Sequence, residues 1–240
     1  RPETFNSFVQ KMAMDLQSKL EICKDNDEIR CIILTGHGKA FCAGQDLKEA
    51  IDPSGPKIEE IVKKHYNPII MKIREIKKPV LAAVNGVAAG AGANLALACD
   101  LIVATKSASF IQAFSKIGLI PDSGGTYHLP RLIGLQKAAG IMMTGEKITA
   151  TKAESLGMIY AVYDDSEFEQ KSIKLASIIS SMPTKALGYT KKLLSETFNN
   201  SLDDQLNLEA KMQALSASTE DHKIGIEAFL KKCSPKFKGK

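Results

Sequence analysis

The sequence contains no tryptophan, and only 6% of its 240 residues are aromatic. Nucleic-acid-binding proteins usually combine a basic surface with aromatic side chains, so this composition argues against that class. The formal net charge is only +5. Much of this excess lies in the last ten residues, a pattern typical of a solvated chain end but also suited to binding phosphates. The lysines concerned are Lys231, Lys232, Lys236, Lys238 and Lys240.

Long apolar runs are also missing. No run approaches the ~20 residues that a membrane helix requires, and the start shows no signal-peptide pattern. The five cysteines are an odd number without a CxxC pair, which predicts buried, reduced thiols in a cytoplasmic protein. The four histidines lack metal-ligand spacing, so no metal site is expected. These residues are Cys23, Cys31, Cys42, Cys99 and Cys233, and His37, His65, His128 and His222.

The composition that remains is ordinary for a globular protein, and one stretch organises it. Residues 80–84 form a short apolar run that predicts a buried strand, and a loop rich in glycine and alanine leads from it into a predicted helix at 94–98. The spacing of Gly86, Gly90 and Gly92 fits neither a P-loop nor the dinucleotide fingerprint. From this loop alone, close packing of a helix on a sheet and an anion-binding turn are equally supported.

A second copy of the pattern lies earlier in the sequence. Residues 31–34 predict another buried strand, and Ala43-Gly44 lies before a second apparent helix start. Two such turns on neighbouring strands could direct two backbone N–H groups at one point. A pair of preorganised donors is what an enzyme needs to hold a thioester oxygen as it gains negative charge.

Three segments carry a resemblance to a known family. FCAGQDL at 41–47, AVNGVAAGAGANLALACDLIVAT at 83–105 and SFIQAFSKIGLIPDSGGTYHLPRLIG at 109–134 resemble the enoyl-CoA hydratase/isomerase (crotonase) superfamily. The likeness covers the whole chain. Within the superfamily the sequence is most similar to the ring-1,2-epoxyphenylacetyl-CoA isomerases of bacterial phenylacetate degradation.

The resemblance implies an α/β fold, the crotonase-like (ClpP/crotonase) spiral of ββα units with a C-terminal helical trimerisation region. Residues 1–180 would form the spiral core, without its N-terminal hairpin, and residues 181–240 the helical region. That region would build homotrimers or hexamers. The helical pattern alone also allows these helices to pack on the core of their own chain instead of on a neighbouring subunit.

Periodicity gives further elements. Phe8, Met12, Leu16 and Leu20 predict a helix that Asn6 or Ser7 could cap. Further helices are predicted at 132–143, at 168–179, at 184–198 and around 202–215, and a last strand at 159–162. Residues 49–66 have the composition of a mobile lid, which would line the acyl pocket.

The chemistry depends on carboxylates. In the hydratases of this superfamily two glutamates hold the attacking water, and the matching positions here are Asn94 and Phe114. Neither can take a proton, so simple hydration is not expected. Asp122 lies where the resembling isomerases carry their catalytic aspartate, although an aspartate before a helix is also a common N-cap. An apolar acyl pocket would raise the pKa of Asp122 and make it a better base near neutral pH.

The resemblance also assigns the remaining site residues. The backbone N–H groups of Gln45 and Ala91 would bind the thioester oxygen, with Gly90 adjoining. Acyl-CoA contacts would come from the first turn and from the C-terminal helix of an adjacent subunit. The former are Ala43, Asp46, Leu47 and Lys48, and the latter are Phe229 and Lys232. No cofactor is expected, because coenzyme A is part of the substrate.

Several alternatives stay open at this point. The same base could move a double bond from position three to position two of an enoyl-CoA. A dehalogenase, thioesterase or decarboxylase, or a non-catalytic acyl-CoA-binding scaffold, could use the same fold. Among single residues, Cys42 and His128 favour structural roles, Ser123 lacks the GxSxG context, and Tyr127 and Gln112 are candidate substrate contacts. The choice of acyl group depends on side chains from residues 49–75.

Overall fold

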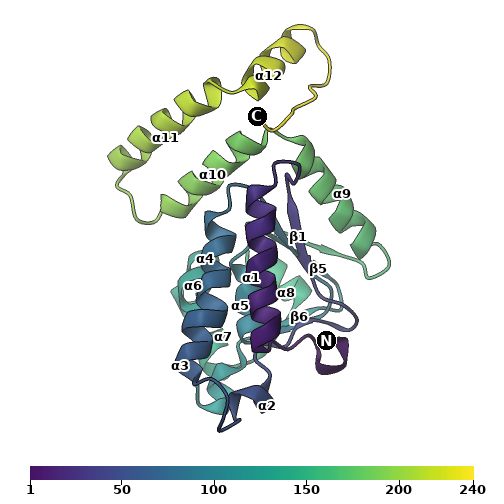
Figure 1. The fold of residues 1–240 in the computed structure, drawn as a ribbon, viewed down its shortest axis with the longest axis vertical. Coiled ribbons are helices and arrows are strands. Elements are labelled where there is room, and N and C mark those ends of the chain that lie inside the picture. Colours follow the sequence, from purple (N-terminus) through teal and green to yellow (C-terminus); the bar gives the residue numbers. More distant parts are fainter.

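Two four-stranded sheets form the centre of the structure, a computed structural model that describes residues 1–240 (Figure 1). The first sheet has the order β1-β3-β5-β8 and is parallel throughout. Its strands are β1 (Ile32–Thr35), β3 (Val80–Val84), β5 (Leu101–Thr105) and β8 (Ala161–Tyr163). The second has the order β2-β4-β6-β7, with only the β6–β7 pair antiparallel. Its strands are β2 (Ala40–Cys42), β4 (Val87–Ala89), β6 (Ser109–Ile111) and β7 (Lys147–Thr149).

From β1 to β6 consecutive strands alternate between the two sheets, so each ββ pair adds one strand to each; β7 and β8 also join different sheets, in the reverse order. Helix α2 (Leu47–Ala50) follows β1 and β2, and α5 (Ala91–Leu97) follows β3 and β4. A 3₁₀ helix (Ala113–Ile117) follows β5 and β6. This repetition confirms the predicted spiral of ββα units. Strand β4 lies in the stretch that was predicted as a loop, and β2 was not predicted, because three-residue strands carry little sequence signal.

The core lies between these sheets and the helices of the first two thirds of the chain. All five residues of β3 are buried, as their apolar run predicts. The surrounding helices are α1 (Gln10–Asp25), α3 (Ile58–Glu60), a π-helical turn (Ile61–Tyr66), α4 (Asn67–Glu75), α6 (Gly125–Ile133), α7 (Leu135–Thr144) and α8 (Ala150–Ser155). No helix has both the length and the apolar character needed to cross a membrane.

Three element predictions were wrong in detail. Helix α1 begins at Gln10 without a side-chain cap, because the Asn6 amide instead bonds the carbonyl oxygens of His37 and Ala40. The predicted helix at 132–143 is two helices, since Gly134 (φ 78°) ends α6 and starts α7. The last strand begins two residues later than predicted, at Ala161.

The C-terminal third is helical, with α9 (Phe168–Ser181), α10 (Thr184–Glu196), α11 (Leu202–Ala217) and α12 (Glu220–Leu230). Helices α11 and α12 stand away from the sheets, at the opposite end of the molecule from α2 (Figure 1). The final segment is held in place, because the Lys238 and Gly239 N–H groups donate to the buried Asp221 carboxylate. The lysine side chains of this end are exposed, as a solvated end predicts.

The cysteines are all free thiols, and the prediction that they are buried holds only in part. Cys42 and Cys99 are buried, and burial raises the pKa of each to about 12. Cys42 is therefore a neutral thiol in a packed turn, not an activated nucleophile. Cys233 is exposed, because it follows the last turn of α12, where no other element covers it.

Candidate active site

The two Ala-Gly turns lie against each other. Strands β2 and β4 are parallel neighbours, so the turns that follow them leave the same edge of the sheet. A Cβ atom on Gly44 (φ 90°) would lie 2.9 Å from the Ala89 carbonyl oxygen and 3.4 Å from the Ala91 nitrogen. One on Gly92 would lie 2.2 Å from the Cys42 carbonyl oxygen. Glycine at both positions is therefore what allows the turns to meet.

Each turn presents an unused backbone donor. Gln45 bridges to Phe8 through the bonds from Phe8 N–H to Gly44 O (2.7 Å) and from Asp46 N–H to Phe8 O (2.8 Å). These bonds leave the Gln45 N–H without an acceptor, and the Ala91 N–H at the start of α5 has none either. Two free N–H groups on adjoining turns are the arrangement that binds a developing oxyanion.

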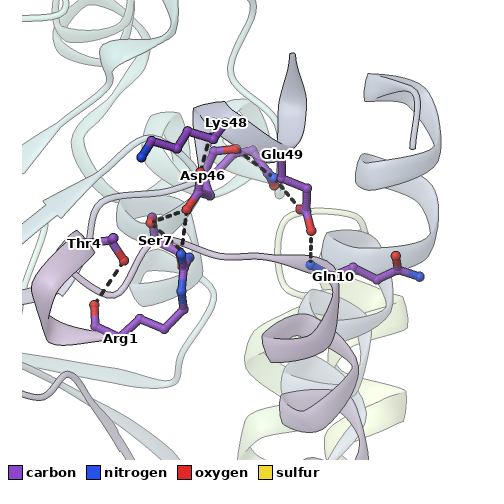
Figure 2. Close-up of polar contacts among 8 residues, drawn as sticks. Arg1, Thr4, Ser7, Gln10, Asp46, Lys48 and Glu49 are labelled. Carbon is purple, nitrogen blue, oxygen red and sulfur yellow. Dashed lines mark hydrogen bonds and ion pairs between the residues drawn. The ribbon is translucent and has the colours of Figure 1, made fainter. Parts of the chain in front are cut away.

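The first turn is fixed by the Asp46 carboxylate (Figure 2). Asp46 accepts from Arg1 Nη2 at 2.8 Å and from the Lys48 N–H at 2.9 Å, which caps α2. The bond from Arg1 holds the pKa of Asp46 below its usual value. Both Asp46 carboxylate oxygens are thus used within the turn. The predicted contact of Asp46 with substrate would therefore have to come from its main chain.

The Gln45 side chain joins this turn to the π-helical turn at residues 61–66. The Tyr66 hydroxyl donates to Gln45 Oε1 at 2.6 Å, and Gln45 Nε2 donates to Glu49 Oε2 at 2.8 Å. Tyr66 is buried, and burial raises the pKa of its hydroxyl, which stays a donor at neutral pH. Sequence reasoning missed Tyr66 and Glu49. The only available signal was their position within residues 49–75, the segment expected to line the acyl pocket.

Asp122 lies in the turn before α6 and is not its N-cap. Gly124 holds that position, and no side chain caps the helix. The Asp122 carboxylate accepts from the Ser123 hydroxyl at 2.8 Å. Burial raises the pKa of Asp122, and the Ser123 bond opposes that rise. The environment therefore makes Asp122 easier to protonate than an ordinary aspartate, as suits a group that accepts and returns a proton.

Helix α5 connects the second donor turn to Asp122. Asn94 lies one helical turn after Ala91, and its Nδ2 donates to the Asp122 carbonyl oxygen at 2.8 Å. Gln112 Nε2 donates to Asn94 Oδ1 at 2.7 Å, so Gln112 contacts Asn94 rather than an open cavity. The Phe114 ring lies beside the turn, 3.8 Å from where a Cβ of Gly90 would be. The two positions matched to hydratase glutamates thus hold a bonded amide and an apolar ring.

The remaining predicted contacts lie further out. Leu47 and Lys48 are exposed at the rim of the first turn, and the Lys48 ammonium makes no hydrogen bond or ion pair (Figure 2). Ala43 is half-buried within the turn. Phe229 and Lys232 lie at the α12 end of the molecule, so one chain does not bring them to the other site residues (Figure 1).

A large cavity lies beside the site rather than at it. Its volume is about 960 Å³, and it is lined by α4, α6, α9 and α10, including Gly124 but none of Gln45, Ala91 and Asp122. His128 and Tyr127 line it. Burial lowers the pKa of His128 to about 4, so this histidine is neutral and makes a poor base. No cluster of histidine, cysteine and carboxylate side chains could hold a metal ion.

Sequence comparisons give relatives that match over the full chain. The family model for enoyl-CoA hydratase/isomerase matches residues 1–240. The 1,2-epoxyphenylacetyl-CoA isomerase of Escherichia coli is 44% identical over 243 residues, which cover 100% of this chain and 93% of that protein. A protein named probable enoyl-CoA hydratase from Rhodobacter capsulatus is 41% identical, covering 100% of this chain and 92% of its own.

Solved structures give the same pattern. An enoyl-CoA hydratase from Bacillus anthracis superposes with a TM-score of 0.93 at 34% identity, covering 100% of this chain and 93% of that one. An enoyl-CoA hydratase from Polaromonas also has a TM-score of 0.93, at 33% identity, covering 99% of this chain and 93% of its own.

Proposed function

The chain belongs to the enoyl-CoA hydratase/isomerase family, and we propose that it isomerises 2-(1,2-epoxy-1,2-dihydrophenyl)acetyl-CoA in cytoplasmic phenylacetate catabolism. The family and its crotonase fold, both predicted from the sequence motifs, are confirmed by the full-length matches. The observation that carries the proposal is the placement of the half-buried Asp122 carboxylate on a turn that Asn94 ties to the second free donor.

The first step is activation of the thioester. Its carbonyl oxygen accepts hydrogen bonds from the Gln45 and Ala91 N–H groups, the two unused donors of the adjoining turns. These bonds strengthen as negative charge moves onto the oxygen, and each is worth about 2.7–4 kcal/mol of barrier in comparable sites. The carbon next to the thioester becomes acidic as a result.

The second step is proton transfer by Asp122. Its carboxylate takes the proton from the carbon next to the thioester, and the bond shared by the epoxide and the six-membered ring breaks. The oxygen becomes part of a seven-membered oxepin ring, and Asp122 returns the proton to a ring carbon. No atom is gained or lost, so the step needs no cofactor beyond the coenzyme A that the substrate carries.

Hydration is disfavoured by the two positions where hydratases hold water. Asn94 is engaged by Asp122 and Gln112, and Phe114 is a buried ring. Neither side chain can take a proton from water. Several relatives are named hydratases. Glu49, the other carboxylate near the donor turns, already accepts from the Gln45 side chain and the Gln10 N–H.

A second candidate is conversion of a 3-enoyl-CoA to a 2-enoyl-CoA in fatty-acid oxidation. It uses the same two donors and the same proton transfer by Asp122. The identity of 44% to the 1,2-epoxyphenylacetyl-CoA isomerase favours the ring-epoxide as the substrate over a linear enoyl chain.

The coenzyme A portion is proposed to bind between subunits of a homotrimer or hexamer. Lys48 is exposed at the rim of the first turn and carries a free ammonium group. Phe229 and Lys232 would reach the nucleotide from a neighbouring copy, since they lie far from Lys48 in their own chain (Figure 1). Apolar side chains that a neighbour would cover are exposed on and between α10 and α11. They are Leu194, Phe198, Leu202 and Leu206.

The test is turnover by Asp122→Asn. This variant keeps the shape of the side chain but removes the base, so kcat is expected to fall about 10²–10⁴-fold with the fold retained. Asp165→Asn, at the end of the first sheet, is the matched control and should keep the wild-type kcat. A folded Asp122→Asn protein that turns over the ring-epoxide at the wild-type rate would refute the proposed role.

A further inference from the structure

The turn that carries Asp122 has a backbone that needs outside support. Ser123 (φ 51°) and Gly124 (φ 73°) both lie in the left-handed region. A residue other than glycine in this region costs about 1–3 kcal/mol and persists only where its surroundings fix it. Ser123 is nevertheless buried within the turn.

Asn94 supplies one of the constraints. The Asp122 carbonyl oxygen accepts from the Gly125 N–H within the turn and from Asn94 Nδ2, both at 2.8 Å. A Cβ on Gly125 would lie 2.3 Å from the same Nδ2, so the turn is seated directly on the Asn94 amide. Asn94 is fully buried.

Gln112 fixes which way the Asn94 amide faces. Gln112 Nε2 donates to Asn94 Oδ1 at 2.7 Å, which leaves only Nδ2 to face the Asp122 carbonyl. Gln112 is itself 2% exposed, and its Oε1 has no hydrogen-bond partner. An unpaired buried acceptor costs about 1–3 kcal/mol. Two apolar side chains of similar size would avoid that cost, so stability alone does not account for this pair of amides.

We infer that Asn94 and Gln112 are positioning residues that set the distance between the Asp122 base and the Ala91 donor. The inference rests on the proposed function. Asn94 and Ala91 both belong to α5. The hydrogen bond from Asn94 to Asp122 therefore fixes the position of the Asp122 turn relative to the Ala91 N–H. The position matched to a hydratase glutamate would thus hold the catalytic aspartate in place instead of activating water.

The double variant Asn94→Leu/Gln112→Met tests this. Replacing both partners by apolar groups of similar size is nearly neutral for stability, whereas removing one partner leaves the other unpaired. A displaced base slows the chemical step, and a shift of about 1 Å can cost about 100-fold. We expect kcat on the ring-epoxide or a 3-enoyl-CoA to fall about 10- to 100-fold, with KM within about twofold of wild type.

Ser109→Ala is the matched control. Like Gln112 Oε1, the Ser109 hydroxyl is a buried polar group without a hydrogen-bond partner, but it lies in β6 and does not hydrogen-bond to Asn94. Its kcat should equal that of wild type. A folded double variant with wild-type kcat, or one with only KM raised, would overturn the inference and leave the proposed function intact. If the double variant does not fold, the Gln112→Met variant is measured instead, and the same fall in kcat with an almost unchanged KM is expected. A wild-type protein that isomerises neither thioester would overturn both proposals.

Discussion

Two opposed influences act on the Asp122 carboxylate. Burial raises its pKa, and the Ser123 hydroxyl that donates to it lowers the pKa. The proposed base role of Asp122 requires its deprotonated form, so kcat should fall as the pH drops through the raised pKa. The acid limb of the profile therefore reports directly on this environment.

The Ser123→Ala variant removes the larger of the two hydrogen bonds that lower the pKa of Asp122, the other coming from the backbone N–H of Asp122 itself. The pKa of Asp122 then rises further, so the acid limb of the kcat profile should move to higher pH while the plateau changes little. Measuring kcat against pH for wild type, Ser123→Ala and the remote Ser180→Ala checks this. A limb that stays in place, or moves to lower pH, would show that the titrating group is not Asp122.

Single residues of the site were predictable to different degrees. Asp122, Gln45 and Ala91 were named because contiguous motifs carry them, and their roles remain proposals. The contributions of Tyr66 and Ser123 were not predicted, because each depends on a side-chain bond whose geometry only the fold supplies. Asn94 was considered only as a residue that cannot take a proton from water. Its bond to Asp122 spans 28 residues of sequence and leaves no local pattern.

At the scale of elements, the contact between β2 and α5 depends on Gly92. A Cβ there would lie 2.2 Å from the Cys42 carbonyl oxygen, which is backbone and cannot move aside alone. Gly92→Ala should therefore lower the free energy of unfolding by about 1–3 kcal/mol. It should also lower kcat, since the two donor turns would be pushed apart.

The control for this prediction is Gly140→Ala in α7. A Cβ at Gly140 would meet nothing within 4 Å, and alanine favours a helix by about 0.8–1.0 kcal/mol over glycine. Denaturant unfolding of both variants should thus give opposite signs. A Gly92→Ala protein as stable and active as wild type would contradict the close approach of the two turns.

Elements were predicted best where the apolar pattern is long. Strand β3 and helices α9 and α10 lie where their periodicity placed them. The split at Gly134 was missed, because apolar residues continue at helical spacing on both sides of it. Tertiary packing decides where such helices end, and this packing cannot be read from the apolar pattern of a single sequence.

At the scale of the whole molecule, the α12 end and the Lys48 rim are far apart in one chain (Figure 1). If neighbouring copies complete the coenzyme A site, light scattering should give a mass of about three or six times 26.0 kDa. A stable monomer at assay concentration would contradict this arrangement.

Mixed assemblies make the same prediction sharper. Asp122→Asn and Lys232→Glu each impair a different part of the shared site, so either protein alone should be weakly active. Coexpression would place an intact Asp122 beside an intact Lys232 from the neighbour, and activity should recover in part. Coexpressed protein that is no more active than the two variants assayed separately would show that each chain completes its own site.

The most direct measurement is chromatographic separation, with mass spectrometry of each peak, of the products that wild-type protein forms from ring-1,2-epoxyphenylacetyl-CoA, a 3-enoyl-CoA and a 2-enoyl-CoA. An isomer is recognised by its new retention time at unchanged mass. The proposed function predicts that the ring-epoxide is converted to a product of unchanged mass and that the 2-enoyl-CoA gains no water. Conversion of the 3-enoyl-CoA alone would make the chain a fatty-acid isomerase. A 2-enoyl-CoA product heavier by one water molecule would contradict the account, because it would require the water-activating groups that Asn94 and Phe114 cannot supply.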